Sequence, residues 1–336
     1  MSKSYLVTGA TGLLGNNVVR LLLERGERVR VLARRPDDRA LAGLPLEIVH
    51  GDITDSACLA PAMSGIDVVV HSAALVHIGW TRKKEMERIN VEGTRHVAAA
   101  ARAAGARMIH VSSVDALGLG TRDVPADEET PFRSDIVDCG YVLTKRAAEG
   151  VIQDEVQRGL DAVIVNPGYM LGPWDWKPSS GRMILQIARG WVKLAPRGGN
   201  DYCDVRDVAA GIMAAIERGQ TGRRYILGGE PLSFLEAFRL IADVVGVDPP
   251  WRNWRWPIRW GLPAVARVQT LVTGKEPEYN GAAFAISELP HHFSYARAAK
   301  ELGYTLRPVR EAVQTAWDWF QEHGYANNLR ANVKAH

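Results

Sequence analysis

Short apolar runs alternate with longer amphipathic segments through the first half of the chain, and this alternation limits the fold more than any other feature. Strands that are apolar almost throughout are typical of parallel sheets covered by helices on both faces, and alternating strands and helices build βαβ units. The sequence therefore predicts an α/β fold with a doubly wound parallel sheet. Its expected strands are 5–8, 29–33, 46–50, 67–71, 108–112 and 162–166, and the expected helices between them are 13–25, 84–104 and 141–158.

The second half of the chain is less regular. After Asn166 and Pro167, loops rich in glycine and proline separate the regular segments, and four of the ten tryptophans fall within residues 251–260. We interpret this half as a cap that is interleaved with late elements of the sheet. The expected elements are helices near 182–191 and 206–218, a strand at 224–227, and helices at 262–272 and 309–323.

The composition excludes several classes of protein. With 46% hydrophobic and 24% charged residues, the chain is typical of a globular protein. Its 41 Lys and Arg nearly balance its 38 Asp and Glu, so we expect no nucleic acid as a partner. The cysteines Cys58, Cys139 and Cys203 lack the spacing of a disulfide framework or a zinc site, so we expect no metal. Only four residues precede the first strand and no apolar run reaches about 18 residues, which favours a cytoplasmic protein.

Three glycines with the spacing G-x-x-G-x-x-G lie where the first strand turns into the first helix. Glycine permits a positive φ and a close backbone approach, and a helix N-terminus offers partial positive charge to a phosphate. The flanking strands and helix favour a dinucleotide site over the alternative, a tight turn without a ligand. The cofactor-binding residues expected at this turn are Gly9, Thr11, Gly12, Leu13, Leu14 and Gly15.

The end of the second strand indicates which dinucleotide binds. A carboxylate there accepts a hydrogen bond from the 2′-hydroxyl of NAD, whereas a guanidinium pairs with the 2′-phosphate of NADP. This strand ends in Ala33-Arg34-Arg35, without an acidic residue. We therefore expect NADP, bound through Arg34, and the alternatives are NAD as cofactor and a solvated Arg34.

Tyr141 and Lys145 are four residues apart at the start of a predicted helix, so both side chains lie on one face. An ammonium that stabilises a phenolate makes the phenol a usable acid and base near neutral pH. The spacing alone is common by chance. The helix follows the strand that ends in Ser112 and Ser113, however, and doubly wound folds bind ligands at the carboxyl ends of strands. The pair is therefore a candidate for acid–base chemistry on a carbonyl group.

Further motifs follow the glycine turn in a fixed order. They are Gly51-Asp52-Ile53-Thr54-Asp55, His71-Ser72-Ala73-Ala74, Asn90-Val91-Glu92-Gly93-Thr94, Ser112-Ser113, Tyr141-x-x-x-Lys145 and Asn166-Pro167-Gly168. Over residues 5 to about 230 the set resembles the extended short-chain dehydrogenases/reductases, in the branch of dihydroflavonol 4-reductase, 3β-hydroxysteroid dehydrogenase and hopanoid-associated sugar epimerase-like proteins. The resemblance implies a Rossmann-type sheet with a smaller C-terminal substrate-binding cap. We accordingly expect an NADP-binding Rossmann domain at 1–166 and a substrate-binding cap region at 167–336.

By this resemblance, Ser113 orients the substrate oxygen, Tyr141 passes the proton, and Lys145 lowers the pKa of Tyr141 and holds the nicotinamide ribose. Asp52 and Ile53 would contact the adenine. The remaining expected cofactor-binding residues are Ser72, Ala73, Ala74, Pro167 and Gly168, together with Tyr141 and Lys145.

The family divides into enzymes with a net redox change and enzymes that return the hydride, such as nucleotide-sugar 4-epimerases and dehydratases. The second group typically has an arginine where this chain has Asn200, and a neutral amide cannot replace a guanidinium on a diphosphate. The alternative is that Arg182, Arg189 or Arg197 nearby takes that role. We therefore expect hydride transfer between NADP(H) and an apolar cyclic ketone or secondary alcohol. The alternatives are an epimerase or dehydratase with tightly bound NAD(P), and a regulator that only senses the cofactor.

Three residues are candidates for contact with the substrate: Asp115, Tyr169 and Met170. Asp115 matches the position of an acidic residue in sugar-nucleotide dehydratases, and a turn-forming role is its alternative. The aromatic residues Trp80, Trp174 and Trp176 either line the pocket or pack the cap.

Residues 251–272 combine tryptophans with Arg252, Arg255, Arg259 and Arg267. Such a segment suits a membrane surface, but we expect a buried cap helix whose arginines reach solvent, and hence no membrane partner. The expected partner is a small-molecule substrate, and the sequence leaves a homodimer open.

Overall fold

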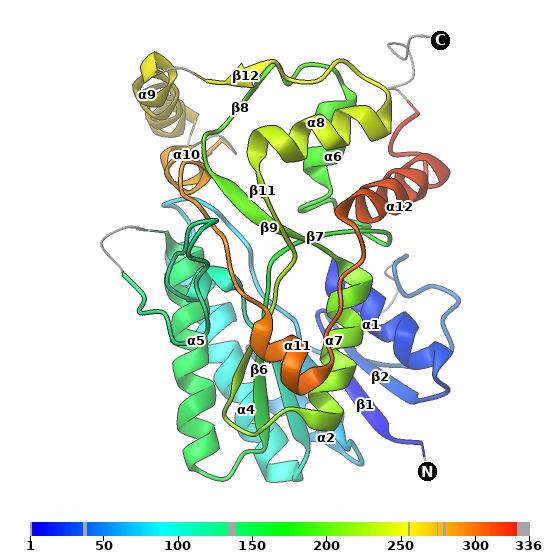
Figure 1. Ribbon diagram of the computed structural model, residues 1–336. Helices are drawn as coiled ribbons and strands as arrows, with labels where there is room; N and C mark the ends of the chain where they lie inside the picture. The colour runs from blue at the N-terminus through cyan, green and yellow to red at the C-terminus, as the bar shows by residue number, and fades with distance from the viewer. Residues whose placement is uncertain are drawn as a thin grey trace.

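The computed structural model describes residues 2–35, 39–133, 139–254, 256–273, 275–277 and 280–327. Its centre is a seven-stranded sheet in the order β10-β6-β5-β4-β1-β2-β3, in which all neighbouring strands are parallel (Figure 1). The six predicted runs and the predicted strand at 224–227 make up this sheet, so the doubly wound α/β fold is confirmed. The strands are β1 (Ser4–Thr8), β2 (Arg28–Ala33), β3 (Glu47–His50), β4 (Val68–His71), β5 (Arg107–Val111), β6 (Ala162–Pro167) and β10 (Arg224–Leu227).

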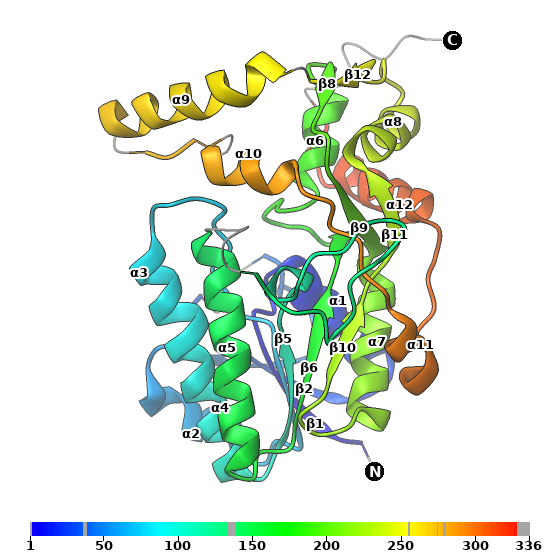
Figure 2. The ribbon, with the colours of Figure 1, turned by 60° about the vertical axis from the view of Figure 1, so that its left-hand side comes forward.

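Helices cover both faces of the sheet (Figure 2). Consecutive residues of a strand point to opposite faces, and Leu6 and Val7 of β1 belong to the two hydrophobic clusters on either side of the sheet. This burial on both faces explains why the central strands are nearly continuous apolar runs. One face carries α1 (Leu13–Glu24), α7 (Val205–Arg218) and α11 (Ala296–Leu302), and the other carries α2 (Leu59–Met63), α4 (Gly93–Ala104) and α5 (Gly140–Gln157).

The helical stretch predicted at 84–104 has nearly the expected ends but is not uniform. It consists of α3 (Lys83–Met86), a π-helical segment (Glu87–Glu92) and α4. Asn90 in the π-helical segment is buried, and its side chain accepts a hydrogen bond from Leu75 N (2.7 Å) and donates one to Leu75 O (3.0 Å). Segments of this kind are frequent at functional sites. Here the segment directs a side-chain amide at the loop that follows β4.

The cap lies above the carboxyl ends of the sheet strands (Figure 1). It combines a second sheet, in the order β11-β9-β7, with three helices that share a hydrophobic cluster. One of these helices, α8, is absent from the sequence prediction, although Ser233 and Glu236 form a capping box at its start, which is a recognisable signal. The cap elements are β7 (Tyr169–Leu171), β9 (Gly199–Asp204), β11 (Glu230–Ser233), α6 (Arg182–Ala188), α8 (Phe234–Val245) and α12 (Val309–Glu322).

The helix predicted at 262–272 is longer than expected, and most of its described side chains are exposed. Helix α9 (Trp256–Thr273) projects from the body of the protein above α10 (Gly281–Ser287) (Figure 2). The expectation of a buried cap helix is wrong: of the side chains at 264–273, Ala266 alone is fully buried, because the short helix α10 is the main packing partner of α9. Arg255 and the side chain of Arg259 lie outside the described part of the chain.

Two short strands, β8 (Leu194–Ala195) and β12 (Arg252–Asn253), pair in parallel and connect this end of the cap to α9. Within the described ranges, no helix is both long enough and apolar enough to span a membrane.

Candidate active site

A cavity of about 620 Å³ opens at the carboxyl ends of β1, β2 and β4. The strand order reverses between β1 and β4, and doubly wound sheets bind ligands at such a point. Four separate segments of the chain bring most of the predicted cofactor-binding residues to this cavity. The predicted residues that line it are Gly9, Thr11, Gly12, Arg34, Asp52, Ile53, Ser72, Ala73 and Ala74.

The glycine turn brings two stretches of backbone into contact. Gly9 has a φ of +75°, which favours glycine, and its carbonyl accepts a hydrogen bond from Gly12 N (2.9 Å). A Cβ on Gly15 would lie 2.2 Å from Gly9 O, so only glycine fits there without a shift. Gly12 is the N-cap of α1, and no side chain at this position competes with an anion for the first amides of the helix. Leu13 and Leu14 pack in the core and hold α1 on the sheet.

Arg34 and Asp52 both line the cavity. Burial alone would raise the pKa of Asp52, but hydrogen bonds from Thr54 and the positive charges of Arg34 and Arg88 lower this pKa below its ordinary value. Asp52 is therefore ionised at neutral pH. Three further cationic residues line the cavity: Arg35, Arg82 and Lys177. Sequence reasoning missed Arg82 and Lys177, because they belong to no motif.

The Ser113 hydroxyl and the Tyr141 phenol meet from different elements. Ser113 follows β5, Tyr141 lies in the first turn of α5, and a hydrogen bond joins the two side chains. Burial raises the pKa of Tyr141, and the negative charge of Asp115 raises it further, whereas the hydrogen bond with Ser113 lowers it. The net result is a neutral phenol, which can donate a proton.

Lys145 lies one helical turn after Tyr141 and is buried. Its Nζ donates a hydrogen bond to Val111 O (2.9 Å) at the end of β5. Burial lowers the pKa of Lys145 to about 8, although the Glu149 carboxylate favours the charged form. The direct partner of the ammonium is thus a strand carbonyl, and its expected effect on the pKa of Tyr141 stays a prediction for the complex with cofactor.

Buried Asn166 connects the strand ends around this site. Its Nδ2 donates hydrogen bonds to Ser113 O (2.9 Å) and to Glu149 Oε1 (2.7 Å), and Arg224 Nε donates one to the other oxygen of Glu149 (2.7 Å). The network links α5, β6, β10 and the loop after β5. It therefore fixes the position of Ser113 relative to the helix that carries Tyr141.

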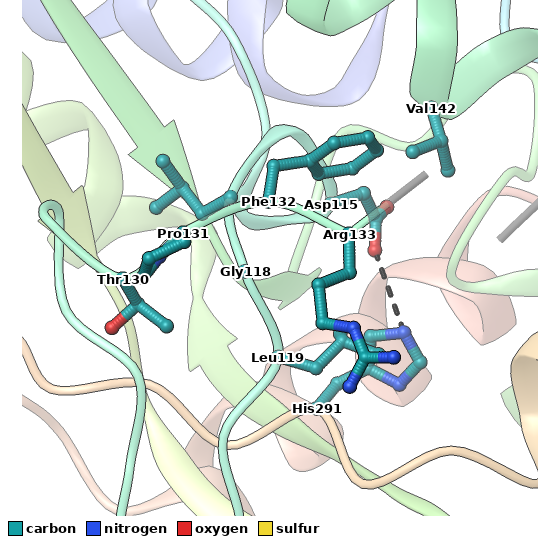
Figure 3. A pocket seen from close by; sticks show the side chains of 10 residues that line it. Asp115, Gly118, Leu119, Thr130, Pro131, Phe132, Arg133, Val142 and His291 are labelled. Carbon is teal, nitrogen blue, oxygen red and sulfur yellow. Dashed lines mark ion pairs between the residues drawn. The ribbon is translucent and has the colours of Figure 1, made fainter. Parts of the chain in front are cut away.

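A second cavity, of about 330 Å³, lies beside the Ser113 loop (Figure 3). Asp115 Oδ2 accepts a hydrogen bond from Ser113 Oγ (3.1 Å), and Asp115 Oδ1 lies 3.9 Å from Nε2 of buried His291. Sequence reasoning missed His291, for which the His291–His292 doublet is the one visible signal. The other lining residues are mainly apolar: Leu117, Gly118, Leu119, Pro131, Phe132 and Val142, with Thr130 and Arg133.

Tyr169 and Met170, the other expected substrate residues, line neither cavity. Tyr169 packs against Tyr202 (5.2 Å between ring centroids), and its hydroxyl donates a hydrogen bond to Ser180 O (3.3 Å). Met170 packs against the hydrophobic cluster beneath α1 and α7.

Pro167 and Gly168 also lie outside both cavities. Pro167 ends β6, and a Cβ on Gly168 would lie 2.6 Å from Asp201 O in β9. These residues therefore set the path of the backbone from the sheet into the cap.

Two of the tryptophans pack the cap. Trp174 and Trp176 contact Trp319 of α12, with ring centroids 6.0 Å and 5.0 Å away, and the guanidinium of Arg20 in α1 lies 3.3 Å from the centre of the Trp174 ring. Of the two interpretations left open by the sequence, packing is the one observed for these residues.

Comparison with known proteins agrees with this geometry. The model of the NAD dependent epimerase/dehydratase family matches residues 5–228. Sterol demethylase protein B of Methylococcus capsulatus is 34% identical over 326 residues, which cover 95% of this chain and 98% of that protein. A Synechocystis protein with the provisional name dihydroflavonol 4-reductase is 35% identical over 337 residues, covering 97% and 96% of the two chains. The crystal structure of gox2253 superposes with a TM-score of 0.84 at 40% identity and covers 96% of this chain and 99% of that one.

The matched region spans the glycine turn, Ser113 and the Tyr141–Lys145 pair, and it contains every residue that lines the two cavities except His291. The seven-stranded sheet with its reversal between β1 and β4 is the Rossmann-type arrangement that the motifs imply. The chain belongs to the NAD dependent epimerase/dehydratase family, within the extended short-chain dehydrogenases/reductases, and is an NAD(P)-dependent oxidoreductase.

Proposed function

We propose that this enzyme transfers a hydride between NADP(H) and an apolar cyclic ketone or secondary alcohol. The cavity beside Ser113 and Asp115 carries the proposal, because its wall is mainly aliphatic and aromatic. Diphosphates are bound by cations and charge-assisted hydrogen bonds, whereas a wall of this kind suits a ring compound. Two relatives have names that refer to ring compounds, a sterol and a dihydroflavonol.

Asn200 supports the same choice of substrate. Its side chain accepts a hydrogen bond from Asp201 N (3.0 Å) in β9. An amide in this position offers no pair of parallel donors to a diphosphate, which is the arrangement that makes arginine effective in nucleotide-sugar enzymes.

Each residue of the site has a distinct role in the proposed reaction. When bound, NADP(H) supplies or accepts the hydride. Tyr141 would donate a proton to the carbonyl oxygen during reduction and remove it during oxidation, and the Ser113 hydroxyl would orient that oxygen. Lys145 would hold the nicotinamide ribose. The glycine turn would bind the pyrophosphate through backbone amides, and Asp52 would face the adenosine.

The activity test uses the purified protein with NADPH and a panel of steroid, flavonoid and aryl ketones, and follows the oxidation of NADPH. We expect turnover of at least one apolar ring ketone. Tight co-purification of cofactor, together with conversion of sugar nucleotides without net redox change, would instead identify an epimerase or dehydratase.

Tyr141→Phe tests the proton step. The substitution removes the phenolic hydroxyl and keeps the ring, so we expect it to abolish nearly all turnover and to change the Kd for NADPH by at most about threefold. Turnover and cofactor titration are measured on the same preparation. A variant that retains more than about a tenth of the activity contradicts the role of Tyr141.

Arg34→Ala tests the choice of cofactor. Loss of a charge-assisted contact of about 2 kcal/mol raises the Kd for NADPH by about 30-fold, and the Kd for NADH stays almost unchanged because NADH lacks the 2′-phosphate. Arg28→Ala, at the exposed opposite end of β2, is the matched control and affects neither cofactor. An equal loss of affinity for both cofactors excludes recognition of the 2′-phosphate by Arg34.

A further inference from the structure

Helix α9 turns an apolar stripe toward solvent. Val265, Val268, Leu271 and Val272 are between 59% and 85% exposed. Their spacing places them along one side of the helix, opposite to the buried Ala266. A helix on a globular protein normally buries such a stripe against the core. The orientation of α9 is therefore suited to contact with a surface outside the chain.

Strands β8 and β12 lie at the same end of the molecule as α9 (Figure 1), and an exposed tryptophan precedes each of them in the chain. Trp251 precedes β12, which leads into α9, and Trp191 precedes β8, the partner of β12. Trp251 N donates a hydrogen bond to Lys193 O (3.3 Å), so the segments that carry these tryptophans are adjacent. The indoles are 66% and 78% exposed. Tryptophan prefers the boundary between lipid headgroups and acyl chains, where one part of the ring is apolar and its N–H is hydrated.

The segments around this surface are basic and contain no acidic residue. Residues 249–275 contain four arginines and Lys275 but no Asp or Glu, and residues 182–197 likewise combine three arginines and Lys193 with no acid. The next acidic residue, Glu276, points away from solvent: its side chain is buried and accepts hydrogen bonds from Trp80 N (3.0 Å) and Thr81 N (3.0 Å). Exposed Asp248 flanks this segment, and Glu288 accepts hydrogen bonds from Trp254 Nε1 (2.7 Å) and Arg197 N (3.2 Å). Cations still outnumber acids in these segments, so the charge pattern is complementary to an anionic surface.

We propose that α9, with Trp191 and Trp251, is a docking surface for anionic lipid. The aliphatic stripe of α9 enters the headgroup boundary, the tryptophans lie at the same depth, and the neighbouring cations pair with lipid phosphates. A second copy of the chain fits less well, because a two-fold interface would place the same basic segments against each other. This surface is separate from the cavities that support the proposed function. Lipid binding there does not depend on which substrate the enzyme uses.

The test is cosedimentation of the full chain with vesicles, without any substrate. We expect the protein to sediment with vesicles of phosphatidylcholine and phosphatidylglycerol in equal parts, to remain in solution with phosphatidylcholine alone, and to be released from the mixed vesicles by high salt. The double variant Leu271→Asp, Val272→Asp should bind the mixed vesicles at least about tenfold more weakly. Both side chains are exposed, so the variant should keep the melting temperature of the parent protein.

Val124→Asp is the matched control, since Val124 is 73% exposed but lies in the loop between β5 and α5. It should bind vesicles as the parent protein does. Absence of binding to the mixed vesicles, or equal binding by the α9 double variant, overturns the proposal. So does a dimer in solution that the double variant dissociates while neither protein binds vesicles. NADPH titration of the same samples reports separately on the cofactor site, so a failure here is distinguishable from a failure of the proposed function.

Discussion

Asp115 contributes to the raised pKa of Tyr141, after burial, which is the larger cause. Its carboxylate raises the pKa of Tyr141 and accepts a hydrogen bond from Ser113 Oγ. In the oxidation direction the phenolate is the base, so activity rises with pH as Tyr141 loses its proton. Removal of the negative charge in Asp115→Asn lowers this pKa. We therefore expect the rising limb of the kcat profile to move to lower pH by up to about one unit.

Asp115→Glu is the control for this prediction, because it keeps the charge and should leave the limb close to that of the parent enzyme. The measurement is kcat and KM against pH for oxidation of a secondary alcohol. A several-fold rise in KM with an unmoved limb would make Asp115 a substrate contact instead. If neither constant changes, Asp115 has no part in the reaction.

At the scale of elements, the turn between β1 and α1 depends on close backbone approach rather than on helix propensity. Gly15 lies inside α1, where alanine is intrinsically favoured, but its Cβ would meet Gly9 O at 2.2 Å. We expect Gly15→Ala to destabilise the fold by about 2 kcal/mol and to weaken NADPH binding at least about tenfold, because the loop must shift.

Gly150, in α5, provides the opposite case for comparison. It is exposed, and a Cβ there would meet no atom within 4 Å. Gly150→Ala should stabilise the fold by roughly 0.5–1 kcal/mol and leave cofactor binding unchanged. Thermal unfolding of both variants measures their stability, and NADPH titration measures their affinity for the cofactor. Stabilisation by Gly15→Ala as well would mean that the turn tolerates a side chain.

At the scale of the whole molecule, Glu276 joins the last third of the chain to the loop after β4. This buried carboxylate accepts hydrogen bonds from Thr81 Oγ1 (2.6 Å), from the backbone amides of Trp80 and Thr81, and lies 3.0 Å from His77 Nε2. Burial alone would raise the pKa of Glu276, but these hydrogen bonds lower it below its ordinary value. Its stabilising effect is therefore present above the unfolded pKa and is lost as the pH falls through the folded one.

Glu276→Ala tests this connection. It leaves two backbone amides without their acceptor, so we expect a loss of about 2–4 kcal/mol in stability at pH 7 and a smaller loss at pH 4. Hydrogen exchange should accelerate in residues 77–86, and α4, on the far side of the π-helical segment, serves as the internal control. Unchanged exchange in the 77–86 segment would show that the loop is held by other contacts.

Much of the fold could be predicted because it depends on patterns along the chain. Apolar runs such as 162–165 are required by burial on both faces of a parallel sheet, and they lie in strands of that sheet. The glycine turn could also be predicted, because its three glycines are close together in the sequence and lie where the first helix begins. The capping box of α8 is equally local, so the start of this helix is also encoded in the sequence.

The sequence alone thus determined the doubly wound sheet, its glycine turn and the elements that carry Ser113, Tyr141 and Lys145, because local spacing encodes each of them. Only the tertiary structure decided which distant residues meet: His291 comes to Asp115, and Glu276 comes to the loop after β4. It also decided that the apolar side of α9 faces outward. Periodicity tells which side of a helix is apolar, but whether another element covers that side depends on contacts between segments far apart in the chain.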